Sequence, residues 1–286
     1  MRNCQEPNSP VPHMNLIGRV IMAFMPITPK GLVRFFSRRY VAGTELHHAI
    51  KVMEDMANEN TSFTVDVLGE DITSIEETEW FVTEYQDLIK AISTSKIDAH
   101  ISLKPTAFGL DIDYDHALST VSELAKLASD FDIFVRLDME DSDHTESTLR
   151  MTEDLHKLGH RNTGVVLQGR LFRTLDDLER LSASLGPDAD VRICKGIYLE
   201  HPDIAYTGYN DIVRATSAAV SKALDLGMYV GVASHDHPVI NSTIKSLDER
   251  NFVFPGQDPR EPAPTKREGK GNCLLYTSDA ADDGYR

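Results

Sequence analysis

The stretch "VRICKGIYLE", residues 191–200, begins like a buried β-strand and yet carries two cations, Arg192 and Lys195. A charge inside a protein core is costly unless it is paired or binds something. The two cations therefore indicate a strand whose end serves a ligand. Just beyond them, Gly196 would let a flat ligand approach the backbone, and Tyr198 can stack and donate a hydrogen bond.

Apolar, β-rich runs of the same kind recur along the chain and alternate with helical patterns. The runs cover 62–68, 99–104, 133–138, 163–168, 190–195 and 229–235, and helical patterns cover 145–159, 174–186 and 209–227. Strand–helix alternation with continuously apolar strands is typical of a parallel sheet covered on both faces. We therefore predict an α/β fold, a distorted (βα)8 TIM-type barrel with N-terminal helices. A doubly wound sheet is the alternative, but no Gly-x-Gly-x-x-Gly follows the first strand.

Nearly every predicted strand ends in a polar or charged side chain, which favours the barrel. The carboxyl ends of barrel strands converge on one face, where active sites lie. The strand-end residues are Lys104, Asp138, Glu140, Gln168, Lys195, Tyr198, His235 and Asp236. For any one of these residues, a solvated strand end or a salt bridge is the simpler interpretation. Taken as a set, the residues predict one site.

The composition of the chain divides it into four parts. Residues 1–13 form a polar leader, 14–60 an N-terminal helical segment, 61–254 an incomplete barrel, and 255–286 a tail that does not fit the pattern. Four prolines in 255–272 predict neither strand nor helix there. We interpret the tail as non-native sequence, produced by a frameshift and adapter read-through, so that the last strands and the final helix are missing. A natural disordered tail is the alternative.

Charge and cysteine usage narrow the possible partners. The formal net charge of −16 argues against a general nucleic-acid surface. Three widely spaced cysteines fit a reducing cytosol and do not indicate a disulfide framework.

No transmembrane helix is predicted, because the apolar run 16–27 contains a charge and is too short to span a membrane. The basic segment 30–40 either packs against the barrel or contacts anionic lipid peripherally.

The predicted site combines cations with carboxylates. Lys104, Arg192 and Lys195 carry positive charge, which Asp138 and Glu140 can balance in part, leaving the rest for an anionic ligand. Two other chemistries remain open from the residues alone. The segment "SHDHP" (234–238) could hold a metal ion, and either lysine could form a Schiff base.

Five segments together resemble the proline dehydrogenase family, in its monofunctional bacterial form. "VRICKGIYLE" resembles the family's Arg-x-x-Lys-Gly-Ala-Tyr-x-Glu strand, with Ile197 in place of alanine. The other four are "ISLKPTAFGL" (101–110), "VRLDMEDSDHT" (135–145), "VVLQGRLFRT" (165–174) and "VGVASHDHPVI" (230–240), in which Ser234 replaces threonine. The family's closing Tyr-x-x-Arg-Arg helix, which clamps the proline carboxylate, has no counterpart after Phe254.

The resemblance implies a flavoenzyme of proline catabolism, the route from proline to glutamate. It would oxidise L-proline to Δ1-pyrroline-5-carboxylate with FAD and pass electrons to a quinone. It would be cytoplasmic, or peripheral at the inner face of the membrane. The alternatives are a metal- or Schiff-base-dependent barrel lyase and an inactive truncated fragment.

The resemblance also implies roles for individual residues. Asp138 and Arg192 would be catalytic, Lys104 would meet the substrate carboxylate, and Tyr198 would contact substrate and cofactor. No metal site is implied. The residues implied to bind FAD are Met139, Gln168, Arg192, Gly196, Ile197, Tyr198, Ser234 and His235.

Overall fold

The computed structural model of the protein describes residues 45–57, 61–70, 72–95, 97–251 and 273–276. The chain divides into two compact units, 1–52 and 53–286. Of the first unit, only the start of helix α3 (Leu46–Ala57) is described. The predicted polar leader and the basic segment 30–40 lie outside the described residues.

The second unit is built on one sheet in which seven strands follow one another in chain order, every neighbouring pair parallel. The strands are β1 (Phe63–Val65), β2 (Ala99–Leu103), β3 (Val135–Leu137), β4 (Thr163–Gln168), β5 (Asp190–Cys194), β6 (Tyr229–Ala233) and β7 (Cys273–Tyr276). The α-helices between them are α4 (Thr78–Ser95), α5 (Tyr114–Asp130), α6 (Thr145–Lys157), α7 (Thr174–Leu185), α8 (Tyr209–Asp225) and α9 (His237–Glu249). Short 3-10 turns are η2 (Ile75–Glu77), η3 (Pro105–Phe108), η4 (Ser142–His144) and η5 (Gly186–Asp188).

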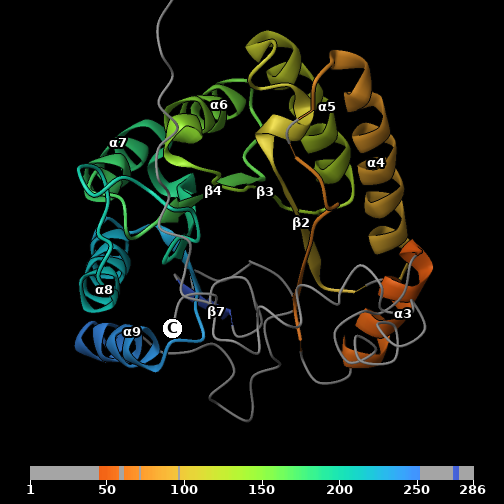
Figure 1. The fold of residues 1–286 in the computed structure, drawn as a ribbon. Helices are drawn as coiled ribbons and strands as arrows, with labels where there is room; N and C mark the ends of the chain where they lie inside the picture. Colours follow the sequence, from red (N-terminus) through yellow and green to blue (C-terminus); the bar gives the residue numbers. More distant parts are fainter. Residues whose placement is uncertain (1–44, 58–60, 71, 96, 252–272, 277–286) are drawn as a thin grey trace, which may run out of the picture. The chain divides into compact units, whose positions relative to one another are not determined.

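The sheet of this unit curves, and its helices follow one another around the outer face (Figure 1). This arrangement confirms the predicted α/β class and the first six strands at the predicted places. Strand β4 shows why these strands could be predicted. All six of its residues are buried. A strand covered on both faces needs apolar or small residues throughout, which is what the sequence supplies.

The helices bury one face against the sheet and cap their ends locally. In α7, Leu178, Leu181 and Leu185 recur at helical spacing and are almost completely buried. Gly186 ends that helix with a positive φ of 61°. Asp113 begins α5 and accepts hydrogen bonds from two backbone N–H groups of its first turn.

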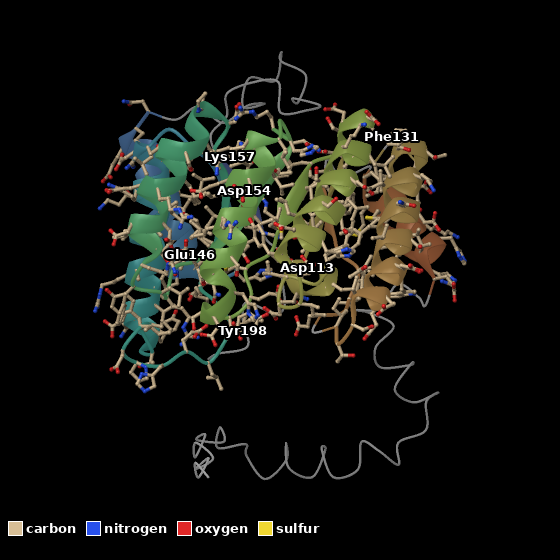
Figure 2. All side chains as sticks on the ribbon, turned by 90° about the horizontal axis from the view of Figure 1, so that it is seen from above. Asp113, Phe131, Glu146, Asp154, Lys157 and Tyr198 are labelled. Atoms are coloured by element: carbon tan, nitrogen blue, oxygen red, sulfur yellow. The ribbon has the colours of Figure 1, made fainter. Side chains whose placement is uncertain are left out.

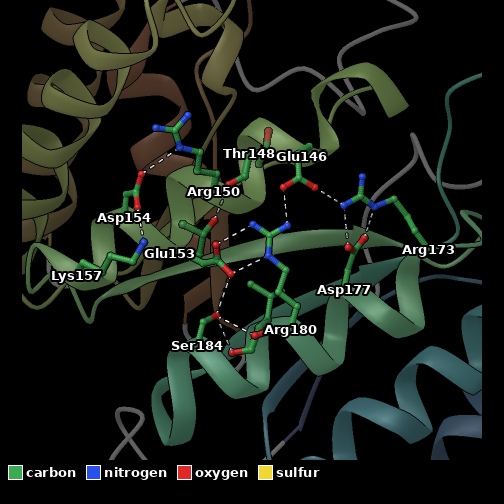
Figure 3. Close-up of polar contacts among 12 residues, drawn as sticks. Glu146, Thr148, Arg150, Glu153, Asp154, Lys157, Arg173, Asp177, Arg180 and Ser184 are labelled. Atoms are coloured by element: carbon green, nitrogen blue, oxygen red, sulfur yellow. Dashed lines mark hydrogen bonds and ion pairs between the residues drawn. The ribbon is translucent and has the colours of Figure 1, made fainter.

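A network of ion pairs joins α6 and α7 on the outside of the unit (Figure 3). Arg180 of α7 donates two hydrogen bonds to Glu153 of α6, at 2.9 and 2.8 Å, and a third at 2.7 Å to Glu146. Arg173 also reaches Glu146, at 2.6 Å, and pairs with Asp177 on its own helix. Because Glu153 and Asp177 are nearly buried, the two arginines neutralise carboxylates that the packing has partly removed from water.

The end of the sheet differs from the sequence-based expectation. No strand was expected in 255–286. Residue 251 lies in a turn, residues 252–254 are outside the described residues, and β7 instead occupies 273–276 beside β6. The physical reason is that "CLLY" is a short apolar run without proline, and its pairing with β6 satisfies backbone groups that would otherwise be exposed along that edge. The proposed origin of the tail remains a prediction.

Candidate active site

The loops that follow strands β2 to β5 lie at one end of the second unit. Tyr198, which follows β5, is at that end, and Phe131, which precedes β3, is at the opposite end (Figure 2). Parallel pairing places the carboxyl ends of β2, β3, β4 and β5 side by side. The predicted residues Lys104, Asp138, Gln168 and Arg192 therefore reach one region, as predicted.

A partly buried hydrogen-bonded triangle forms the centre of this region. Arg192 of β5 donates at 2.5 Å to Asp138, just after β3, and at 2.7 Å to the Ser102 hydroxyl of β2. The Ser102 hydroxyl in turn donates to the same Asp138 oxygen at 2.6 Å. The Arg192 residue is only 9% exposed. Three strands thus fix one guanidinium group in position, with its charge balanced by one carboxylate.

Glu140 was expected to pair with a cation, and the structure corrects this. Its carboxylate accepts hydrogen bonds from the backbone N–H and the hydroxyl of Thr106, at 3.1 and 2.5 Å. Thr106 lies in the first turn of η3, where backbone N–H groups have no partner within the turn. Burial raises the pKa of the Glu140 carboxyl, although both Thr106 hydrogen bonds oppose the shift. Glu140 therefore ties the loop after β3 to the loop after β2.

Gln168, the last residue of β4, places an unused acceptor in the same region. Its amide nitrogen donates at 2.6 Å to the Glu140 carbonyl. Its side-chain oxygen is buried and has no hydrogen-bond partner among the described residues. Because a buried acceptor without a partner is costly, this oxygen suits a ligand that brings an N–H group.

The loop after β5 is held by a cation that the sequence analysis missed. Arg170, 5% exposed, donates to the Tyr198 carbonyl at 2.6 Å and to the Tyr206 carbonyl at 3.2 and 3.3 Å. Gly196 has a φ of +96°, and a Cβ there would lie 2.4 Å from the Gln168 side-chain oxygen. The glycine is thus required by the protein's own side chains, and the ligand approach expected at this position is not tested by the structure.

Tyr198 faces a concentration of negative charge. Burial raises the pKa of its hydroxyl well above the usual value, and the carboxylates Glu70, Glu140, Asp141 and Asp138 raise it further. The hydroxyl therefore stays protonated at all physiological pH values and can act as a hydrogen-bond donor.

The two lysines of the predicted cationic cluster have separate partners. Lys104 lies 3.4 Å from Glu70 and does not pair with Asp138 or Glu140. Lys195 lies 3.2 Å from Asp236, whose other oxygen accepts from the Tyr209 hydroxyl of α8 at 2.8 Å. Lys195 lies one residue beyond the end of β5 and reaches toward α8, where its Nζ is 6.0 Å from the centroid of the Tyr209 ring. Lys195 therefore does not join the central triangle.

The remaining predicted residues occupy the ends of β3, β5 and β6. Met139 is buried directly after Asp138, and Ile197 is 41% exposed beside Gly196. Ser234 is buried, and its hydroxyl accepts from the Asp236 backbone N–H at 3.1 Å. His235 is half-buried. These positions fit a rim around the central triangle.

Two other observations concern the described residues only. No group of three or more His, Cys, Asp or Glu side chains in them is arranged to hold a metal ion. No helix among them is long and apolar enough to cross a membrane.

A cavity of about 410 Å³ lies at the amino ends of β2 and β3, lined by Asp98, His100 and Arg161 among others, and none of the predicted site residues lines it.

Comparisons with known proteins identify the family of the chain. Residues 49–250 match the family model described as proline dehydrogenase. Proline dehydrogenase 1 of Bacillus subtilis subsp. natto is 30% identical over 219 residues, which cover 77% of this chain and 71% of that protein. The proline dehydrogenase of Deinococcus radiodurans is 30% identical over 222 residues, 76% of this chain and 69% of that protein.

A likeness to a solved structure supports the fold. Proline utilization A from Bdellovibrio bacteriovorus superimposes with a TM-score of 0.73 at 18% identity. The match covers 83% of this chain but only 29% of that longer chain. The family match, the two bacterial relatives and the shared fold lead to one conclusion: this chain belongs to the proline dehydrogenase family.

Proposed function

We propose that the protein oxidises L-proline to Δ1-pyrroline-5-carboxylate with FAD as its cofactor. The observation that carries the proposal is the triangle of Ser102, Asp138 and Arg192 beside the unpartnered oxygen of Gln168. It lies at the carboxyl end of a parallel sheet, in a chain of the proline dehydrogenase family.

The residues present fit a flavin. When bound, FAD supplies the oxidant, taking a hydride and its two electrons from the proline ring carbon next to nitrogen. The Gln168 oxygen would accept a hydrogen bond from an N–H group of the ring system. Arg192 would place a fixed positive charge where negative charge develops on reduction. Met139, Gly196, Ile197, Tyr198, Ser234 and His235 would complete the binding surface.

Lys104 and Tyr198 would hold the substrate. The Lys104 side chain is 24% exposed, and its 3.4 Å pair with Glu70 leaves donors for a proline carboxylate. Tyr198 would offer its protonated hydroxyl, and Asp138 would keep Arg192 oriented through the catalytic cycle. Asp138 and Arg192 thus form the catalytic pair of the proposal.

We further infer that the curved sheet is the major part of a distorted (βα)8 barrel, and that the chain has the four parts 1–13, 14–60, 61–254 and 255–286. A quinone would reoxidise the flavin of this cytoplasmic enzyme, and the basic segment 30–40 would contact the inner face of the membrane. Salt-sensitive co-sedimentation of the chain with anionic liposomes would support that contact, and binding unaffected by Lys and Arg substitutions in 30–40 would contradict it.

Proline-dependent reduction of a dye acceptor by the FAD-loaded chain tests the function. Lys104→Met should raise KM for proline roughly ten- to hundredfold, because a charge-assisted hydrogen bond is lost. Lys157→Met, on the outer face of α6, is the matched control and should leave KM unchanged. No proline-dependent reduction by the wild-type chain, or equal KM values for both variants, would contradict the proposal.

The lyase alternative is less well supported by the geometry. A Schiff-base lysine must react as the neutral amine. Both lysines are instead engaged by carboxylates, Lys104 by Glu70 at 3.4 Å and Lys195 by Asp236 at 3.2 Å. The inactive-fragment alternative predicts no turnover in the same assay.

A further inference from the structure

His144 lies between two loops of the proposed active site and contacts a carboxylate with each ring nitrogen. Its Nδ1 is 2.6 Å from Asp141, the residue that caps its own turn η4, and its Nε2 is 2.9 Å from Asp111, in the connection between η3 and α5. A neutral imidazole has one N–H donor, whereas the imidazolium has two. Only the protonated ring can donate to both carboxylates at once.

The loop that carries His144 also carries Asp138 of the proposed catalytic pair and Met139 of the proposed cofactor surface. Besides the hydrogen bonds of Arg192 and Ser102 to Asp138, four further contacts hold this loop in place. Thr106 binds the Glu140 carboxylate, Gln168 binds the Glu140 carbonyl, and Glu200 accepts from the Ser142 backbone N–H at 2.9 Å. The fourth contact is the His144 bridge to Asp111, the one of the four that depends on the protonation of a histidine.

We propose that His144 is a positioning residue, whose imidazolium form clips the loop after β3 to the loop after β2. Below the pKa of His144 the two loops are held together, and above it the bridge is lost and both loosen. The inference rests on the proposed function only for the statement that these loops belong to the active site.

The charges around His144 support this assignment. Burial lowers the pKa of the ring, but the hydrogen bonds and charges of Asp111 and Asp141 outweigh it and leave the pKa above its usual value. Glu140, earlier in the same loop, also interacts electrostatically with the ring. Among nearby charged groups, Asp143 and Glu146 flank His144 in sequence, and Glu200 binds the same turn. All of these groups are acidic, and Glu146 is itself paired with Arg173 and Arg180 of the neighbouring helix α7.

The sign of the effect follows from the direction of the pKa shift. A histidine whose pKa is raised in the folded state contributes its full stabilisation below the pKa of the unfolded chain. The contribution is lost as pH rises through the folded-state pKa. The two loops should therefore be ordered at mildly acidic pH and loosen on the alkaline side.

The test uses the full chain and needs no catalytic turnover. The side-chain nitrogens of His144 are followed by NMR against pH, with the signal assigned by its absence in His144→Gln. We expect a titration midpoint above that of a free histidine side chain, lower in Asp111→Asn and unchanged in Asp115→Asn, an exposed acid at the start of α5. A midpoint at or below the free value would overturn the proposal.

Hydrogen exchange then tests the mechanical consequence. Protection factors of amides in 106–112 and 138–144 should fall about tenfold as pH passes the measured midpoint, because a charge-assisted hydrogen bond is lost. Protection in β4 and β5 should not change. In Asp111→Asn the fall should move to lower pH, and His144→Gln should show low protection throughout. Protection in the two loops that is independent of pH would overturn the proposal, whether or not the protein oxidises proline.

Discussion

Replacing Asp138 with alanine should leave the Arg192 guanidinium buried without its carboxylate. The change removes the acceptor of two hydrogen bonds, one from Arg192 at 2.5 Å and one from Ser102 at 2.6 Å. Removing one partner of a fully buried ion pair costs about 3–5 kcal/mol. The Asp138 side chain is 24% exposed, so water can reach part of the vacated space. We therefore expect the free energy of unfolding to fall by about 2–3 kcal/mol.

Urea unfolding of the full chain, followed by far-UV circular dichroism, measures this loss. For a unit of this size it corresponds to a fall of roughly 4–12 °C in Tm. A double-mutant cycle isolates the pair itself. Arg192→Met removes the charge and keeps an apolar stem, so the double variant should be more stable than the sum of the single effects predicts, by about 1–3 kcal/mol.

A change of less than about 0.5 kcal/mol in the free energy of unfolding of Asp138→Ala, the range of ordinary surface substitutions, would show that the ion pair does not stabilise the fold. Simple addition of the effects of the two single substitutions would show the same. Asp138→Asn is the matched control for shape, because it keeps an acceptor for Arg192 and removes the negative charge. We expect its effect to lie between those of the wild type and Asp138→Ala.

Three further predictions follow from other contacts. Gly196→Ala should destabilise the chain by about 1–3 kcal/mol and weaken FAD binding, because the new Cβ would meet the Gln168 oxygen at positive φ; wild-type flavin affinity would contradict this. Arg180→Met should flatten the acid limb of the stability–pH profile. Arg180 lowers the pKa of Glu153, so its stabilisation is present above the unfolded-state pKa and is lost as pH falls through the lower folded value; an unchanged acid limb would count against the pair. Tyr85→Phe should cost about 1–2 kcal/mol in urea unfolding, since its buried hydroxyl donates at 2.7 Å to a carbonyl of β2, and a neutral effect would show that this bond contributes nothing.

The strand order and most helices could be predicted because their signals are local. The run 163–168 is apolar from end to end and forms β4 over those same residues. The leucines of 174–186 recur at helical spacing and form α7. Because the strands are parallel and follow chain order, their ends lie side by side. No long-range signal in the sequence is needed to predict this. For that reason the sequence alone sufficed to group Asp138, Gln168 and Arg192.

The partners of the site residues could not be predicted, because they depend on which face each side chain occupies. Lys195 is only three residues from Arg192, yet it pairs with Asp236, whereas Arg192 pairs with Asp138. Ser102 has no signal in the sequence beyond a hydroxyl in an apolar run, yet it completes the triangle. In the sequence, Arg170 cannot be told from any other loop arginine. Its three hydrogen bonds to carbonyl groups are visible only in the structure.

The end of the sheet was missed for a different reason. The prolines of 255–272 dominate the composition around the four residues "CLLY", so the apolar run 273–276 gave no strand signal of its own. Its strand forms only beside the open edge of β6, which is a tertiary effect that local propensity does not report.

The most direct test of the proposed function is the visible absorption spectrum of the FAD-loaded full chain under anaerobic conditions, recorded before and after L-proline is added. The account predicts that the flavin band bleaches and that Δ1-pyrroline-5-carboxylate forms in an amount equal to the flavin reduced. The Arg192→Met variant should bleach far more slowly. A flavin band that persists with saturating proline would contradict the account and would favour the inactive-fragment alternative.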